Sequence, residues 1–173
     1  MDKRVFIKST KELLKEKGFI ILKNNKYVIE YPECYVTLWF KFGGDKVVIN
    51  YNVCFKRIHK NVNVIEDFND WNLCDFNVWG ILNHYCDTNK ENRRNLLELD
   101  ISSYKDILYK MLQLYIEPFN DSLNDIISFI NKGRKYNYTP FSQSIYIEPY
   151  RFLSEAKEFL LENGMMPIEE FFE

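Results

Sequence analysis

The sequence lacks any long hydrophobic run and is poor in alanine, which occurs once, at Ala156, among 173 residues. A helix that spans a membrane needs about 20 consecutive, mostly apolar residues, so none is expected. Charged residues interrupt the apolar positions between Met1 and Lys8 too early for the apolar core of a signal peptide. These absences predict a cytoplasmic protein with no membrane partner.

An excess of one charge is also missing. The 23 basic and 25 acidic residues leave a formal net charge of −2. Non-specific binding to the phosphates of a nucleic acid needs a one-sided positive field. The charge balance therefore argues against nucleic acid as a partner and leaves another protein as the expected one, while the oligomeric state stays open.

The four cysteines form no CxxC pair, so we expect reduced, mostly buried thiols rather than a disulfide framework. Cys74, His84 and Cys86 would need His59 or Cys54 to complete a tetrahedral zinc site. Alternatively, His84 could act as a base beside a Cys86 nucleophile if this segment is a strand. Because chance alone yields such pairs, we predict no metal, no cofactor and no catalytic residue.

Apolar residues, in contrast, are plentiful, at 46% hydrophobic and 17% aromatic content. This is enough to bury the core of a single domain over residues 1–173. The abundance of Tyr, Phe, Asn and Lys beside one alanine is typical of an AT-rich coding sequence. We therefore expect a low-GC bacterium as the source.

The first third of the chain predicts one helix followed by four strands. Residues 4–17 place their apolar side chains on one face, and Gly18 is a typical C-terminal cap. Apolar and polar residues then alternate in an order that fits an antiparallel meander. Its predicted strands are 19–22, 26–31, 34–42 and 46–55.

The rest of the chain is predicted to be mainly helical after residue 100. Residues 56–71 resemble an exposed connection, and 78–85 and 95–99 are possible further strands. Residues 102–117 carry helical spacing up to Pro118, after which the pattern resumes at 123–130 as a bent continuation or a second helix. A last helix is expected over 149–160.

These elements predict an α+β fold. An N-terminal helix should cover the apolar face of an antiparallel sheet of about four to six strands, followed by two or three C-terminal helices. Residues 1–100 would form the helix and sheet, and residues 101–173 the mainly helical part of the same domain.

The order of elements resembles a large bacterial family of small α+β proteins catalogued as a domain of unknown function. The matching residues are the helix leading into Lys17-Gly18-Phe19, the meander, and the interruption Ile116-Glu117-Pro118-Phe119, and together they span residues 4–131. The resemblance implies no reaction and no catalytic residue. It does imply an immunity or accessory protein of a bacterial toxin system.

Two surfaces are candidate contact sites. Tyr35, Trp39 and Lys41 occupy the non-core positions of the longest predicted strand, where later helices could cover them or a partner could bind them. A platform for stacked bases is a further alternative, but the flanking charge is balanced rather than basic.

The second candidate surface is the acidic segment Glu66 to Asp75, in which Asp67, Asp70 and Trp71 are the predicted contact residues. A solvated loop, a docking surface for a basic partner and a metal site are the alternatives, although the segment lacks the ligand spacing of a calcium loop.

For function, the sequence favours a non-enzymatic interaction module. The alternative is a small hydrolase or nuclease-like enzyme, with acid and base groups that folding would assemble from Asp67, Asp70, Asp75, His59 and His84.

Overall fold

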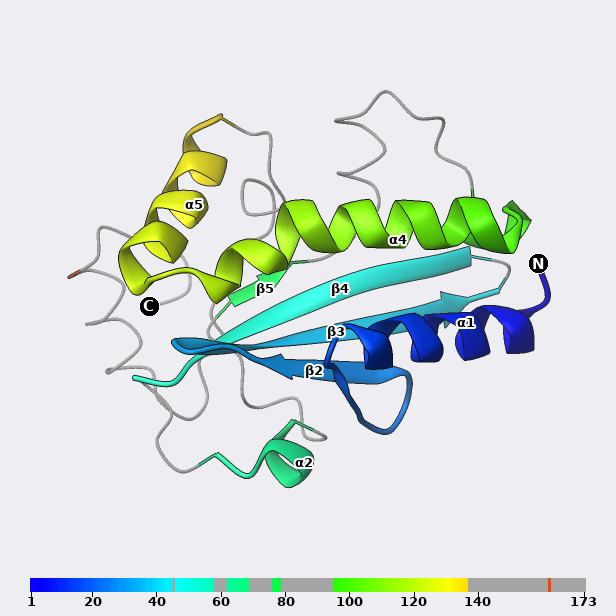
Figure 1. Cartoon of the computed structure of the whole chain (residues 1–173), viewed down its shortest axis with the longest axis horizontal. Helices are drawn as coiled ribbons and strands as arrows, with labels where there is room; N and C mark the ends of the chain where they lie inside the picture. The colour runs from blue at the N-terminus through cyan, green and yellow to red at the C-terminus, as the bar shows by residue number, and fades with distance from the viewer. Residues whose placement is uncertain (45, 58–61, 69–75, 79–94, 137–161, 163–173) are drawn as a thin grey trace.

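A computed structural model describes residues 1–44, 46–57, 62–68, 76–78, 95–136 and 162. Within them the elements follow one another from a first helix, through a sheet, to a group of helices (Figure 1). In chain order these are α1 (Lys3–Glu16), β1 (Ile20–Ile21), β2 (Lys26–Glu30), β3 (Cys34–Gly43), β4 (Lys46–Phe55), α2 (Val64–Asp67), β5 (Phe76–Val78), the 3-10 helix η1 (Leu96–Glu98), α4 (Ile101–Tyr115), the 3-10 helix η2 (Glu117–Asn120) and α5 (Leu123–Tyr136).

The strands form one antiparallel meander in the order β1-β2-β3-β4-β5, which confirms the predicted α+β class and antiparallel sheet. The long strands β3 and β4 pair along their whole length, from Cys34 with Phe55 to Gly43 with Lys46. The edge strands β1 and β5 are short, so the longest strands lie in the middle of the sheet.

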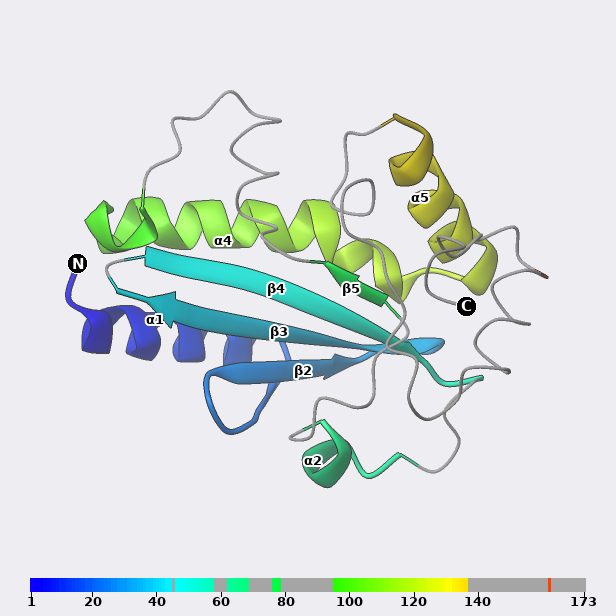
Figure 2. The same cartoon turned by 180° about the vertical axis from the view of Figure 1, so that it is seen from behind.

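Helices α1 and α4 lie on the same face of the sheet, as both views show (Figures 1 and 2). Alternate residues of β3 and β4 point into this layer because side chains of a strand alternate between its faces. The core between sheet and helices is aromatic, with the rings of Phe6 of α1 and Tyr104 of α4 centred 4.5 Å apart and Phe40 of β3 beside them. The prediction that the first helix covers the apolar face is confirmed.

The end of α1 is a Schellman motif at Gly18. The Gly18 amide donates to the carbonyl of Lys15, and the Phe19 amide donates to that of Leu14. Gly18 has a φ of +87°, a conformation that glycine adopts without the clash of a Cβ atom. The turn directs Phe19 back into the core, where it is buried together with Leu14.

The break predicted at Pro118 separates α4 from α5 as two helices. Pro118 lies at the start of η2, where a missing amide proton costs no helical hydrogen bond. Phe119 of η2 is fully buried, and Ile126 and Ile130 of α5 join the same core. Helix α5 thus packs on the same core as α1 and α4. Among the described residues, it is α2 and the Phe68 that follows it that pack on the opposite face of the sheet, against Tyr35.

Two segments differ from the sequence-based predictions. The strand expected at 95–99 is wrong: Asn95 accepts a hydrogen bond from the Leu97 amide and starts η1, and buried Leu96 anchors this turn to the core. Within the connection 56–71, the Asn63 side chain accepts from the amides of Ile65 and Glu66 and begins α2.

Of the predicted strand 78–85 only its first residue, in β5, is described, and the predicted helix 149–160 lies outside the described residues. In the part of the chain that the structure describes, no helix has the length and apolar character needed to cross a membrane.

Candidate functional site

The candidate site lies on the sheet face opposite α1 and α4, at the end of that face nearest the turn between β3 and β4. Pairing across β2, β3 and β4 fixes which residues share this face. From one end to the other, its rows are Glu30, Tyr35 and Cys54; Val28, Thr37 and Asn52; Lys26, Trp39 and Asn50; Lys41 and Val48; and Gly43 and Lys46.

Trp39 is half-buried and has a fixed position on this face. Its indole N–H donates to the backbone carbonyl of Asn24 at 3.2 Å. Asn24 and Asn25 have φ values of 58° and 57°, so the chain reverses between β1 and β2 through a left-handed turn that asparagine tolerates. The amide of Phe40 donates to the carbonyl of Asn25, so β3 holds this turn at two successive residues.

Two lysine ammonium groups lie close to the Trp39 ring. The Nζ atom of Lys41 is 3.5 Å from the ring centroid, and that of Lys26 is 5.7 Å away. Attraction between a cation and the negative face of an indole stabilises such contacts. Burial, and then the positive charge of Lys26, lower the pKa of Lys41 below its usual value.

We define the Trp39 surface as Lys26, Trp39, Lys41, Lys46 and Val48. Lys26 is nearly buried, at 6% exposure. Val48 is 39% exposed, and Lys46 is exposed beside it. Its three lysines come from three adjacent strands.

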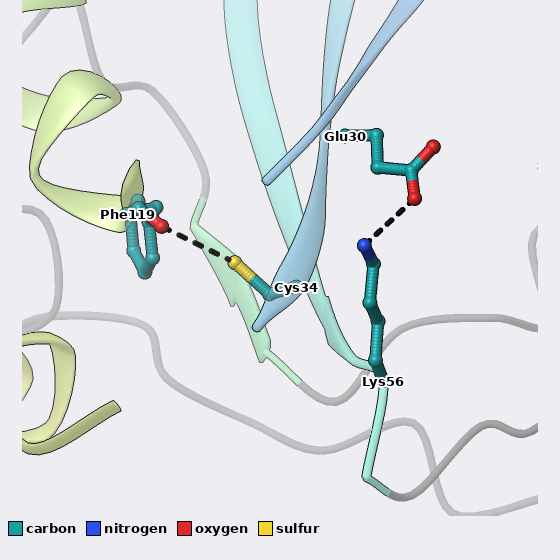
Figure 3. A network of polar contacts seen from close by, with 4 residues as sticks. All are labelled: Glu30, Cys34, Lys56 and Phe119. Carbon is teal, nitrogen blue, oxygen red and sulfur yellow. Dashed lines mark hydrogen bonds and ion pairs between the residues drawn. The ribbon is translucent and has the colours of Figure 1, made fainter. Parts of the chain in front are cut away.

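The opposite end of the same face is a small hydrophobic cluster with ion pairs around it. Tyr35 is 9% exposed and packs against Phe68, which follows α2, with ring centroids 5.3 Å apart. Burial and the charge of Glu30 raise the pKa of Tyr35. Lys56 pairs with Glu30 at 2.7 Å, on the side of the sheet away from Cys34 (Figure 3). Positive and negative charges therefore compensate each other here.

The predicted contact residues therefore do not form one site. Some belong to the Trp39 surface, one belongs to the hydrophobic cluster, and others lie outside the described residues. Trp39 and Lys41 lie together, whereas Tyr35 is in the hydrophobic cluster beside Phe68. Asp67 is the last residue of α2. Asp70 and Trp71 lie outside the described residues, so their role stays a prediction.

Most residues of the alternative zinc site, cysteine nucleophile and hydrolase-like site also lie outside the described residues. This holds for His59, Cys74, Asp75, His84 and Cys86. Cys54 is described, and it is a buried thiol of the cluster around Tyr35. Across the described ranges, no group of three or more His, Cys, Asp or Glu side chains could hold a metal ion.

Sequence reasoning missed Lys26 and Lys46 as members of the Trp39 surface. Strand alternation could have placed both on the non-core face, because each lies one residue before a core position. Strand register was the missing information. Lys26 lies beside Trp39 because the two residues are direct partners in the register of β2 with β3.

Comparisons of the chain with protein-family models, curated proteins and solved structures return no significant match.

Proposed function

We propose that this chain is a non-enzymatic protein-interaction module that contacts its partner through the Trp39 surface. The supporting observation is a half-buried tryptophan fixed between a backbone carbonyl and a lysine ammonium group. Tryptophan is enriched among the residues that contribute most binding energy at protein interfaces. A side chain that is already fixed also loses little conformational entropy on binding.

The position of the surface supports the same proposal. Helices α1 and α4 occupy the other face of the sheet (Figure 2), so Trp39 is not needed for their packing. The resemblance to a bacterial family of unknown function adds a biological role to the proposal. The chain would act in the bacterial cytoplasm as an immunity or accessory protein of a toxin system.

The test is affinity purification of the tagged chain from a lysate of its source organism, with mass spectrometry of the bound proteins. We expect one stoichiometric protein to bind the wild-type chain and to be lost with Trp39→Ala. Retention of that protein by a folded Trp39→Ala variant would contradict the proposal.

Tyr109→Ala is the matched control. Tyr109 lies on α4, is 41% exposed, and has the Nζ atom of Lys17 at 4.1 Å from its ring centroid. It places another aromatic ring beside a lysine on a different surface, so its substitution should leave the partner bound. Circular dichroism and thermal unfolding of both variants separate a lost contact from a lost fold.

A further inference from the structure

We infer that a row of basic side chains on the outer side of α1 binds an acidic helix of a partner protein. The row consists of Arg4, Lys8, Lys11 and Lys15, and we call it the α1 basic stripe. Helix α1 lies on the sheet face opposite Trp39 (Figures 1 and 2). This second contact surface is therefore separate from the Trp39 surface and goes beyond the proposed function.

The four basic residues form a straight stripe because of their spacing. They follow one another at intervals of four, three and four residues. An α-helix turns about 100° per residue, so these positions fall within an arc of about 60° around its axis. The buried side chains of α1, among them Phe6 and Leu13, point to the opposite side. All four stripe residues are exposed, and no described element lies over the outer side of α1 (Figure 1).

Most of the stripe charges have no partner within the described residues. Lys8 pairs with Glu12 at 3.9 Å, and the two side chains remain 79% and 51% exposed. Over the part of the chain that the structure describes, the side chains of Arg4, Lys11 and Lys15 form no ion pair or hydrogen bond. An incoming carboxylate can therefore reach these three side chains without displacing another group.

The stripe works against the stability of its own helix. Arg4 and Lys8 lie one turn apart, and like charges at this spacing destabilise a helix. The same holds for Lys11 and Lys15. Arg4 also lies in the first turn, which has no acidic residue of its own beyond the cap at Asp2. The positive end of the helix macrodipole disfavours a cation there. Since local arrangements that oppose stability are expected at functional sites, the stripe favours a binding role.

The spacing of the stripe matches a helix that carries acidic residues at the same intervals. At a rise of about 1.5 Å per residue, its charges follow one another at about 6, 4.5 and 6 Å along the axis. Glutamates at intervals of four, three and four residues repeat these rises, so four carboxylates can meet four basic groups at once. The intervals read the same in both directions, and the match therefore holds for either orientation of the partner helix.

A nucleic acid would be the other anionic macromolecule, and the charges beside the stripe disfavour it. Glu12 and Glu16 are exposed on the neighbouring arc of α1. A nucleic acid duplex is broader than a single helix of about 10–12 Å diameter, so its phosphates would approach these two carboxylates and be repelled. The net charge of −2 on the whole chain also provides no long-range attraction for phosphates. A narrow acidic helix, in contrast, can contact the stripe alone.

The experiment is an NMR titration of the full chain with a peptide that a covalent side-chain link holds in a helix. The peptide carries glutamates at intervals of four, three and four residues, and the reporters are the backbone amide signals of α1. We expect saturable shifts centred on α1 that weaken as salt is added, because exposed ion pairs are screened. A peptide of equal composition with its glutamates spread around the helix aligns fewer carboxylates and should bind about tenfold more weakly.

Charge-neutralising variants locate the contact. Lys11→Gln and Lys15→Gln should each weaken binding about threefold, the effect of losing one exposed ion pair, and the double variant about tenfold. Lys110→Gln is the matched control, because it removes the same charge from an exposed position of α4 and should leave the affinity unchanged.

Thermal unfolding of these variants separates a lost contact from a lost fold. Glutamine has nearly the same helix propensity as lysine, and each stripe substitution removes a like-charge repulsion. Lys11→Gln and Lys15→Gln should therefore unfold at an equal or higher temperature than the wild-type chain while they bind the peptide more weakly. A purely structural role of the two lysines would lower the unfolding temperature instead.

Four results would overturn the inference. They are no shift with the aligned peptide, equal binding of the two peptides, unchanged affinity of the double variant, or tighter binding of a short DNA duplex. All four leave the proposed function standing, because its test is capture of a partner through Trp39 on the other face of the sheet. Conversely, capture that survives Trp39→Ala would remove the proposed function and leave peptide binding by the α1 basic stripe unaffected.

Discussion

The Trp39 side chain combines two roles that a single substitution can separate. Trp39→Phe retains an aromatic ring beside Lys41 but removes the N–H that donates to the carbonyl of Asn24. The loss of one such hydrogen bond should lower the free energy of unfolding by about 1 kcal/mol. Urea unfolding of both proteins measures this difference. Equal midpoints and slopes would mean that the indole N–H does not stabilise the turn.

A buried hydroxyl pair joins α1 to α4 at Thr10 and Tyr104. The Thr10 hydroxyl donates its proton to the carbonyl of Phe6, so the Tyr104 hydroxyl must donate to Thr10 Oγ1. Thr10→Val leaves the fully buried Tyr104 hydroxyl without this acceptor. Such a substitution should destabilise the protein by about 1–3 kcal/mol.

A double-mutant cycle with Tyr104→Phe separates this hydrogen bond from packing effects. Once the Tyr104 hydroxyl is absent, Thr10→Val should cost clearly less, because no buried donor then lacks its acceptor. Chemical denaturation of the four proteins gives the coupling energy. Strictly additive effects of the two substitutions would show that the hydroxyl pair contributes nothing.

The end of helix α1 depends on the backbone conformation of Gly18. A Cβ atom there would meet no atom within 4 Å, so any cost of Gly18→Ala comes from its φ of +87°. An L-residue in the left-handed region costs about 1–2 kcal/mol. Gly43→Ala is the control, because its Cβ atom also enters open space and its φ lies outside that region. Thermal unfolding should show a lower midpoint for the first variant only.

Local sequence patterns explain which helices and strands could be predicted. Helix α1 and the long strands β3 and β4 have an uninterrupted periodicity of apolar residues, and their observed bounds agree with the predicted ones within a few residues. The short η1 was not predicted, because over so few residues an apolar turn and a strand have the same pattern of apolar residues. There a side-chain cap from Asn95 decides the conformation.

The candidate site could be predicted only in part, for a related reason. Trp39 and Lys41 belong to one strand, so alternation alone places them on one face. The contribution of Lys26 depends on the register of another strand, and the burial of Tyr35 depends on Phe68, which follows α2. Contacts between distant segments are not encoded in the periodicity of either segment.

Considered as a whole, the molecule buries several tyrosines, fully or in part, and this burial favours their protonated form. Tyr31 is half-buried, and burial, the charge of Glu117 and the Cys34 thiol raise its pKa to about 12. Burial also raises the pKa values of Tyr27 and Tyr51. An unfolded tyrosine ionises near pH 10. The native state therefore holds these protons more tightly than the unfolded state does.

This difference predicts a loss of stability at high pH. A group whose pKa is raised by folding stabilises the protein below the unfolded pKa, and this contribution disappears as the pH rises toward the folded pKa. For Tyr31 the window extends from about pH 10 to about pH 12. Urea unfolding at a series of pH values from neutral to about 11 should show a falling free energy of unfolding above about pH 10. Tyr31→Phe should fall less steeply, since it releases one proton fewer, whereas parallel curves for both proteins would contradict the role of this side chain.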